Sequence, residues 1–193
     1  IGINGFGRIG RLVARAIMEQ KRDDIEPDPE SHPRMNAFPL LKYDSVHGQA
    51  PFNLERVDDD WLIVDGHKIH RFRTRKIEEL DWEREGVDIV FECTGKFRSA
   101  EDASAHLEVG AKKVLISAPG KGEMPTIVYG VNHDTLKAED TVVSNASCTT
   151  NALAPVAYAL NKTIGIEKGF MTTIHAYTGD QHTVDSSHKD PYR

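Results

Sequence analysis

Apolar and polar positions along the chain recur with two different periods, which predicts strands separated by helices. Residues 1–4 read as a short apolar strand. The next apolar residues recur at the spacing i, i+3, i+4, i+7 and i+8, which places them on one face of a helix. They are Ile9, Leu12, Val13, Ala16 and Ile17. We expect this helix to end near Lys21 and Arg22, where positive charge complements the dipole at its carboxyl end.

Further strands and helices follow in alternation. Asp65-Gly66 is a turn dipeptide, and it predicts a hairpin between residues 61–64 and 68–72. A helix is expected at residues 100–107, with Gly110 as its cap, and another at about 148–163, with Pro155 inside it. The remaining predicted strands are residues 87–94, 114–117, 127–131, 141–144 and 170–175. This order predicts an α/β fold with a mainly parallel sheet.

Residues 23–39 interrupt the pattern. Pro27, Pro29 and Pro33 lie in this segment among charged residues, with almost no apolar side chain. Proline lacks the N–H group that a central strand donates to its neighbour. No buried parallel strand is therefore expected here.

Composition narrows the class of protein. The 193 residues allow one ordinary domain and part of a second. The net charge is −6 with both signs interspersed, so no nucleic-acid partner is expected. No run of about 18 apolar residues and no signal peptide is visible, so no membrane segment is expected. The chain begins without Met and inside a predicted strand, and we interpret it as part of a longer protein.

The two cysteines have different settings. The sequence contains only two cysteines, Cys93 and Cys148. So few cysteines argue against a secreted protein that is built on disulfides and favour a cytoplasmic protein. Cys148 follows a predicted strand and opens a predicted helix, whose dipole is expected to lower the pKa of the thiol. Ser147 or Asn145 is expected to cap this helix. Cys93 lies within an apolar strand and is expected to pack in the core, which leaves Cys148 as the candidate nucleophile.

His175 is the candidate catalytic base. It ends a predicted strand and is followed by a polar run at residues 176–181. A Cys–His pair is the minimum for an activated thiol nucleophile. The chain has 9 histidines, so the position of His175 is modest evidence by itself. No spacing of His, Cys, Asp or Glu matches a metal site, and no metal is expected.

A glycine-rich loop joins the first predicted strand to the first helix. Gly5, Gly7 and Gly10 form the pattern G-x-G-x-x-G in the strand–helix context that binds dinucleotides. Gly5 permits the tight turn, Gly7 lets the backbone approach a pyrophosphate, and Gly10 lets helix and strand pack closely. The amino end of the helix then offers N–H groups to the phosphates. The loop predicts a Rossmann-type sheet with helices on both faces.

Several longer motifs resemble those of the glyceraldehyde-3-phosphate dehydrogenase family. Residues 3–11 are similar to the family's opening, and residues 144–151, Ser-Asn-Ala-Ser-Cys-Thr-Thr-Asn, to its active-site motif. Other segments match in order, namely residues 43–48, 93–95, 116–119, 130–132 and 175–181. The resemblance covers nearly the whole chain except residues 26–39. It implies a dinucleotide-binding domain at residues 1–147 and the start of an α+β catalytic domain at residues 148–193.

The resemblance also implies a reaction, the conversion of D-glyceraldehyde 3-phosphate and inorganic phosphate to 1,3-bisphosphoglycerate with NAD or NADP. Cys148 would attack the aldehyde carbon, and His175 would take the hydroxyl proton of the hemithioacetal as hydride leaves. Phosphate would then attack the resulting thioester. Members of this family form homo-oligomers, usually tetramers, and act in glycolysis in the cytoplasm.

The family's binding residues map onto this sequence position by position. The pyrophosphate end of the cofactor corresponds to Gly5, Gly7, Arg8, Ile9 and Gly10, and the nicotinamide end to Thr94, Gly95 and Ser117. The phosphate contacts correspond to Thr178 and Asp180 at one anion site, and to Ser147 and Thr149 at the other. An anion-binding arginine and an asparagine that contacts the nicotinamide amide would lie beyond residue 193.

Two departures from the family bear on the cofactor. The family places an apolar strand ending in Asn-Asp after the first helix, and that Asp holds the adenosine ribose. Asp28 or Glu30 lies at the corresponding distance, but the proline-rich segment is not expected to position either one, and an extra Pro39 interrupts the next helix. Ser186 and Ser187 are small, as in members that also accept NADP. Weak discrimination between NAD and NADP is therefore expected.

Three other functions share parts of this pattern. Erythrose-4-phosphate dehydrogenase has the same cysteine motif, but residues 177–180, Tyr-Thr-Gly-Asp, favour the triose enzyme. A cysteine hydrolase with a Cys–His pair would have no use for the glycine loop. A non-catalytic member of the family is favoured by the atypical residues 23–39.

Overall fold

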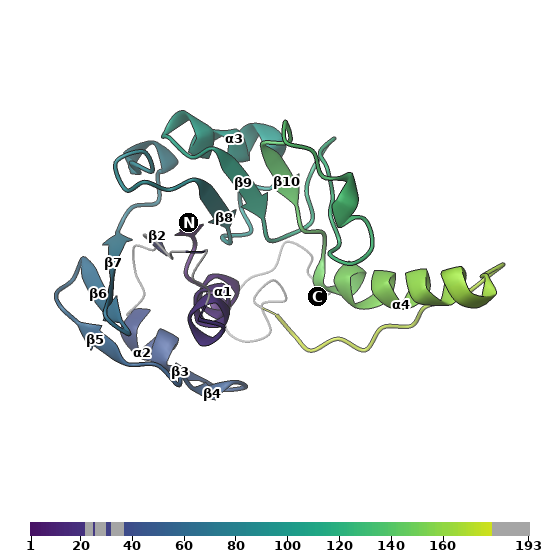
Figure 1. Ribbon diagram of the computed structural model, residues 1–193, viewed down its shortest axis with the longest axis horizontal. Helices are drawn as coiled ribbons and strands as arrows, with labels where there is room; N and C mark the ends of the chain where they lie inside the picture. Colours follow the sequence, from purple (N-terminus) through teal and green to yellow (C-terminus); the bar gives the residue numbers. More distant parts are fainter. Residues whose placement is uncertain (22–24, 26–29, 32–36, 179–193) are drawn as a thin grey trace, which may run out of the picture. The chain divides into compact units, whose positions relative to one another are not determined.

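The computed structural model describes residues 1–21, 25, 30–31 and 37–178. The chain divides into two compact units, Ile1–Val156 and Ala157–Arg193. Figure 1 shows the described residues coloured along the sequence. All the strands belong to the first unit, as far as the described residues extend.

The first unit is built on an eight-stranded sheet with the order β10-β9-β8-β1-β2-β7-β6-β5 (Figure 1). The parallel strands are β10 (Val142–Ser144), β9 (Lys113–Ile116), β8 (Ile89–Glu92), β1 (Gly2–Asn4), β2 (Glu30–Ser31) and β7 (His67–Phe72). The antiparallel strands are β6 (Trp61–Val64) and β5 (Leu54–Arg56), and a separate antiparallel pair consists of β3 (Tyr43–Asp44) and β4 (Gly48–Gln49). The predicted α/β class with a mainly parallel sheet is confirmed.

The helices in the described residues are α1 (Arg8–Glu19), α2 (Ala37–Lys42), α3 (Ala100–Glu108) and α4 (Cys148–Ile164), with 3-10 turns at Ile77–Glu79 and His133–Thr135. The predicted helices are confirmed, although α1 ends slightly earlier than expected. Gln20 caps α1, and its backbone N–H donates to the carbonyl of Ala16. Gly110 follows the carboxyl end of α3 with a φ of 104°, as expected of a glycine at this position.

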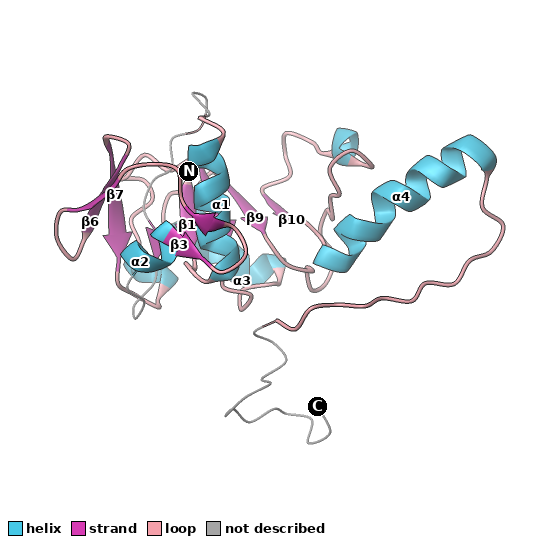
Figure 2. Ribbon diagram, turned by 90° about the horizontal axis from the view of Figure 1, so that it is seen from below, coloured by secondary structure: helices cyan, strands magenta, loops and turns pink. Residues whose placement is uncertain are grey.

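Helices cover both faces of the sheet. Side chains of a strand point alternately to the two faces, and the end of β8 shows this clearly. Cys93 packs in the same hydrophobic core as Ala14 of α1, whereas the preceding Glu92 contacts His106 of α3. α1 and α3 therefore lie on opposite sides of the sheet (Figures 1 and 2).

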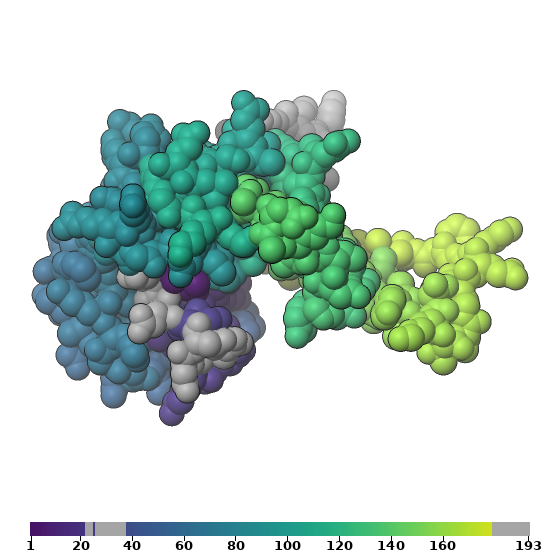
Figure 3. Space-filling view, turned by 45° about the horizontal axis from the view of Figure 1, so that its top comes forward, coloured from purple at the N-terminus to yellow at the C-terminus, as the bar shows by residue number. Residues whose placement is uncertain are grey.

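The strand order creates a switch point beside β1. From β1 the chain continues to β2 on one side, and it later returns to β8 on the other side. The order β7-β2-β1-β8-β9-β10 is the doubly wound order in which loops diverge at the carboxyl edge and leave a crevice for a dinucleotide. The space-filling view shows the blue hairpin segments and the later teal and green segments forming one continuous surface of this unit (Figure 3).

The prediction that residues 23–39 contain no parallel strand was wrong. Glu30 and Ser31 form β2, which pairs in parallel with Ile3 and Asn4 of β1 and with β7 on its other side. Both neighbours supply complete strand edges, so a two-residue segment that avoids the prolines suffices to fill the gap. Asp28 lies outside the described residues.

Three further expectations are corrected. Pro39 does not interrupt a helix but is the third residue of α2, in the first turn where a helix needs no N–H donor. Residues 127–131 do not form a strand, because the chain turns there, with the N–H groups of Val131 and Asn132 both donating to the carbonyl of Val128. Residues 170–175 are not a strand either, since no described strand pairs with them.

Candidate functional site

The glycine loop has the geometry that was predicted for it. Gly5 has a φ of +95°, and a Cβ atom there would lie 2.7 Å from the backbone nitrogen of Thr94. A Cβ on Gly10 would lie 2.0 Å from the carbonyl oxygen of Gly5, so only glycine lets α1 start this close to β1. A Cβ on Gly7 would meet no atom within 4 Å, which leaves the space that a pyrophosphate needs above the loop.

The amino end of α1 is open to an anion. Gly7 is the N-cap, no side chain caps the helix, and its first turn contains no acidic residue. The first N–H groups of such a helix have no partner within it, and together with the helix dipole they attract phosphate. Arg8 and Ile9 are exposed in this turn. These residues fit the pyrophosphate of a dinucleotide.

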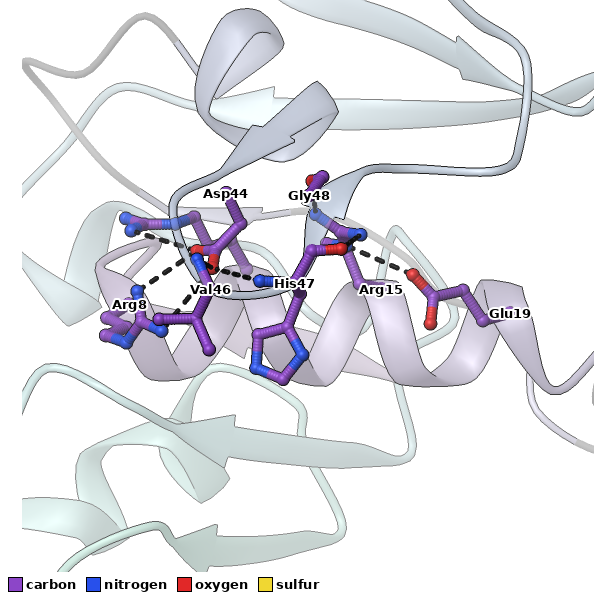
Figure 4. Close-up of polar contacts among 8 residues, drawn as sticks. Arg8, Arg15, Glu19, Asp44, Val46, His47 and Gly48 are labelled. Carbon is purple, nitrogen blue, oxygen red and sulfur yellow. Dashed lines mark hydrogen bonds and ion pairs between the residues drawn. The ribbon is translucent and has the colours of Figure 1, made fainter.

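A buried carboxylate orients the arginines of α1 (Figure 4). Asp44, at the end of β3, lies 3.1 Å from Nη1 of Arg8 and 3.8 Å from Nη2 of Arg11. The backbone N–H groups of Val46 and His47 donate to its Oδ1 at 2.9 and 3.0 Å. The His47 N–H, then the Val46 N–H and the charge of Arg8 lower the pKa of Asp44 to about 2. Asp44 therefore carries a full negative charge at neutral pH and holds Arg8 beside the glycine loop.

Arg15 lies one turn after Arg11 in α1. It fixes the segment between β3 and β4 at the end that leads into β4. Its guanidinium donates to the carbonyls of Gly48 at 3.0 Å and His47 at 3.4 Å, and its Nε donates to Glu19 at 3.1 Å (Figure 4). Arg15 is buried, so these bonds are shielded from water. The segment between β3 and β4 is thus attached to α1 at two places.

Two further loops that were assigned to the cofactor lie at the same edge of the sheet. Thr94 and Gly95 follow β8, and Ser117 follows β9, the next parallel strand. The backbone N–H and the side chain of Thr94 both donate to Oε1 of Glu92. Ser117 donates to the carbonyl of Glu92 through its backbone N–H and its hydroxyl, each at 3.0 Å. The structure therefore brings the predicted pyrophosphate and nicotinamide contacts to one edge.

Cys148 is the first residue of α4 and is exposed. Ser147 caps the helix, because its hydroxyl accepts a hydrogen bond from the N–H of Thr150 at 2.9 Å. Asn145, the other predicted cap, contributes its carbonyl to the side chain of Asn151 instead. Thr149 is half-buried in the first turn. The prediction that Cys148 follows a strand and opens a helix is confirmed.

A buried hydroxyl shapes the turn before Cys148. Ser144, at the end of β10, is fully buried. Its Oγ donates to the carbonyl of Ala118 at 2.8 Å and accepts from the N–H groups of Gly120 at 3.0 Å and Ala146 at 3.1 Å. Ala146 has a φ of +58°, a conformation that costs energy for a residue with a side chain and occurs often at functional sites. This turn brings the chain from β10 into the cysteine helix.

Cys93 has the structural role that was predicted. It is partly buried against the core that contains Ala14 and Ile3. Burial raises the pKa of its thiol to about 11, and the charge of Glu92 contributes to this shift. Cys93 therefore stays protonated at neutral pH and is a poor nucleophile.

The remaining catalytic candidates belong to the second unit. His175 and Thr178 are exposed, and Nδ1 of His175 lies 2.6 Å from the carbonyl oxygen of Ala176. Asp180, Ser186 and Ser187 lie outside the described residues. The pairing of His175 with Cys148 stays a prediction.

Neither a candidate metal cluster nor a membrane-spanning helix is found in the described residues. The described residues contain no group of three or more His, Cys, Asp or Glu side chains that could hold a metal ion. Within the same residues no helix has the length and apolar character to cross a membrane.

Sequence reasoning missed two sets of residues. Asp44 lies within the motif at residues 43–48, and an Asp that precedes by two and three residues the N–H groups from which it accepts is a known turn signal. The second set consists of Glu92 and its partners Asn4 and His106. An acidic residue at the end of an apolar strand, directly before a Thr-Gly loop, was the available signal.

Comparison with known proteins agrees with the motifs. The family model described as glyceraldehyde 3-phosphate dehydrogenase, NAD binding domain, matches residues 1–100, and the model for the C-terminal domain of the same enzyme matches residues 147–193. A protein named glyceraldehyde-3-phosphate dehydrogenase from Cereibacter sphaeroides is 56% identical over 196 residues, and one from Xanthobacter flavus is 54% identical over 195 residues. Each alignment covers 100% of this chain and 58% of the relative. The chain thus spans a little more than half the length of these relatives.

Proposed function

Because this chain belongs to the glyceraldehyde-3-phosphate dehydrogenase family, whose first domain binds NAD, we propose that it oxidises D-glyceraldehyde 3-phosphate and transfers phosphate to the product. The observation that carries the proposal is the position of Cys148. It is exposed at the start of α4, in the unit whose sheet edge carries the glycine loop and the Thr94–Gly95 loop.

The residues at the sheet edge fit NAD. Gly7 leaves open space above the loop, and the uncapped first turn of α1 offers N–H groups for the pyrophosphate. Arg8 and Ile9 would line this end, with Thr94, Gly95 and Ser117 at the nicotinamide end. When bound, NAD supplies the acceptor for the hydride.

Cys148 would begin the reaction as a thiolate. Its sulfur attacks the aldehyde carbon, and the hydroxyl proton of the hemithioacetal passes to His175 as the carbon is oxidised. The product is a thioester on Cys148, which retains much of the oxidation energy because a thiolate is a good leaving group. Inorganic phosphate then attacks the thioester carbon, releases 1,3-bisphosphoglycerate and restores the thiolate.

The phosphate group of the aldehyde and the inorganic phosphate each need hydrogen-bond donors on the protein. Ser147 and Thr149, at the amino end of α4, would bind one phosphate, where the helix dipole favours negative charge. Thr178 and Asp180 would contribute to the other site. We propose that the boundary between the cofactor domain and the catalytic domain lies between residues 147 and 148, so that α4 would open the catalytic domain.

The resemblance supports the same further properties that it implied. We propose that the full-length protein forms a homo-oligomer, most simply a tetramer, and acts in glycolysis in the cytoplasm. No nucleic-acid or membrane partner is proposed. Erythrose 4-phosphate is the alternative aldehyde, and a non-catalytic role is the alternative from a different class.

The proposed function is tested by following NADH absorbance with the full-length protein. We expect NADH formation that needs both D-glyceraldehyde 3-phosphate and inorganic phosphate, with erythrose 4-phosphate a poorer substrate. Changing His175 to Asn should slow hydride transfer by roughly 10²–10⁴-fold and leave NAD affinity nearly unchanged. Faster turnover of erythrose 4-phosphate would assign the alternative substrate, and absence of any NADH formation would favour the non-catalytic role.

A further inference from the structure

A buried carboxylate lies between the two loops that are assigned to the cofactor, the glycine loop and the Thr94–Gly95 loop. Glu92 is the last residue of β8 and is 1% exposed. Its Oε2 accepts from Nδ2 of Asn4 at 2.5 Å and from Nε2 of His106 at 3.1 Å. Its Oε1 accepts from the backbone N–H of Thr94 at 2.8 Å and from the Thr94 hydroxyl. Four donors therefore meet one carboxylate.

The partners of His106 set the direction of its hydrogen bond to Glu92. Nε1 of Trp82, which carries a proton, donates to Nδ1 of His106 at 3.0 Å. Nδ1 is therefore unprotonated, and the ring proton lies on Nε2, which donates to Glu92. A carboxylate has about four lone-pair sites, and all are used here. An amide side chain at this position would leave at least one buried donor without an acceptor, which is costly.

The carboxylate joins two loops that contact each other directly. Asn4 immediately precedes Gly5, so its bond to Glu92 fixes the start of the glycine loop. On the other side, the two bonds from Thr94 fix the loop after β8. The Thr94 backbone nitrogen and its Cγ2 atom would lie 2.7 and 2.8 Å from a Cβ on Gly5, so the two loops are already in contact at this point.

We propose that Glu92 is a positioning residue that sets the spacing between the glycine loop and the Thr94–Gly95 loop, and thereby the affinity for the nicotinamide half of the cofactor. This inference rests on the proposed function, because it assigns the Thr94–Gly95 loop to the nicotinamide end. Glu92 itself, being buried beneath the loops, acts through Asn4 and Thr94.

The test compares NAD with ADP-ribose, which keeps the adenosine and pyrophosphate but lacks the nicotinamide. Calorimetric titration of the full chain gives both affinities for the wild type and for Glu92→Gln. We expect Glu92→Gln to lower the affinity for NAD about tenfold or more, and the affinity for ADP-ribose less than about threefold. Glu85→Gln is the matched control, because Glu85 also binds a histidine, His70 at 3.0 Å, but lies away from the crevice. It should leave both affinities unchanged.

Asn4→Ser provides a second variant that keeps Glu92 and every residue that is assigned to the cofactor. It removes one donor from Oε2 and should lower the ratio of NAD to ADP-ribose affinity about threefold. If Glu92→Gln does not fold, the ratio of the two affinities in Asn4→Ser tests the inference by itself. Equal losses for both ligands would show a purely structural role for Glu92, and an unchanged ratio in both variants would likewise overturn the inference. A wild type that binds neither ligand would instead contradict the proposed function.

Discussion

The guanidinium of Arg8 and the carboxylate of Asp44 form an ion pair at 3.1 Å between the first residue of α1 and the last residue of β3 (Figure 4). The side chain of Asp44 is fully shielded from solvent, whereas that of Arg8 is 44% exposed. Asp44 thus holds the guanidinium of Arg8 beside the glycine loop. Part of that guanidinium stays accessible to solvent.

The first prediction concerns this ion pair and pH. The pKa of Asp44 is lowered to about 2 from an ordinary value of 3.8. A group with a lowered pKa in the folded state stabilises the protein above its unfolded pKa, and this contribution is lost as pH falls toward the folded value. Asp44→Asn should therefore lower the urea midpoint at pH 7, and the difference from wild type should shrink between about pH 4 and pH 2. Urea unfolding monitored by circular dichroism at a series of pH values measures this.

Asp88→Asn is the control for that series. Asp88 forms an exposed ion pair with Lys112, and such surface pairs contribute little to stability. A constant difference between wild type and Asp44→Asn at all pH values would contradict the assigned charge of Asp44.

The second prediction separates two glycines of the same loop. Gly10→Ala should destabilise the protein by about 1–3 kcal/mol, because the added Cβ would press against the Gly5 carbonyl. Gly7→Ala should change stability by less than about 1 kcal/mol, since its Cβ meets nothing, yet weaken NAD about tenfold by filling the space for the pyrophosphate. Thermal unfolding and NAD titration of both variants give the comparison. Unimpaired NAD binding by Gly7→Ala would remove the pyrophosphate from this loop.

The third prediction concerns the reactivity of the two thiols. The pKa of Cys93 is raised to about 11 by burial, so very little of its thiolate exists at pH 8, whereas Cys148 is exposed at a helix start. Iodoacetamide at pH 8 should therefore modify Cys148 first, and Cys93 only after unfolding. Peptide mass spectrometry locates the adduct, with Cys148→Ser as the control that should stay unlabelled in the folded state. Prompt labelling of Cys93 would refute the assignment.

The fourth prediction is weak discrimination between NAD and NADP. Specificity for NAD usually needs a carboxylate at the carboxyl end of the second strand, where it binds the ribose hydroxyls and repels a 2′-phosphate. In the described residues β2 ends at Ser31, after Glu30. We expect the two affinities to differ by less than a factor of about 100, or roughly 2.7 kcal/mol. Calorimetric titration with each cofactor measures the ratio, and a larger preference for NAD would mean that a well-placed acid is present.

Features encoded by neighbouring residues were predictable from the sequence. The glycine spacing, the hairpin turn at Asp65-Gly66 and the helix that starts at Cys148 each depend on a few adjacent residues and a known backbone preference. The α/β class with a mainly parallel sheet also followed from the alternation of strands and helices.

Features that depend on distant neighbours were not predictable in the same way. Asn4 and Glu92 lie 88 positions apart, and the sheet alone brings them together. β2 exists because β1 and β7 offer strand edges on both sides of it, which outweighs its poor local propensity. Residues 127–131 are apolar enough for a strand, but the hydrogen bond from Val128 N–H to the Asn132 side chain at 2.7 Å fixes a turn instead.

The most direct test of the central claim is the covalent intermediate on Cys148. The full-length protein is mixed with D-glyceraldehyde 3-phosphate and NAD without phosphate, quenched with acid, and digested for mass spectrometry while NADH is measured in parallel. We predict one acyl group on Cys148 for each NADH formed in the first turnover, and loss of that group when inorganic phosphate is added before the quench. NADH formation without an acyl group on Cys148, or with the group on Cys93, would contradict the account.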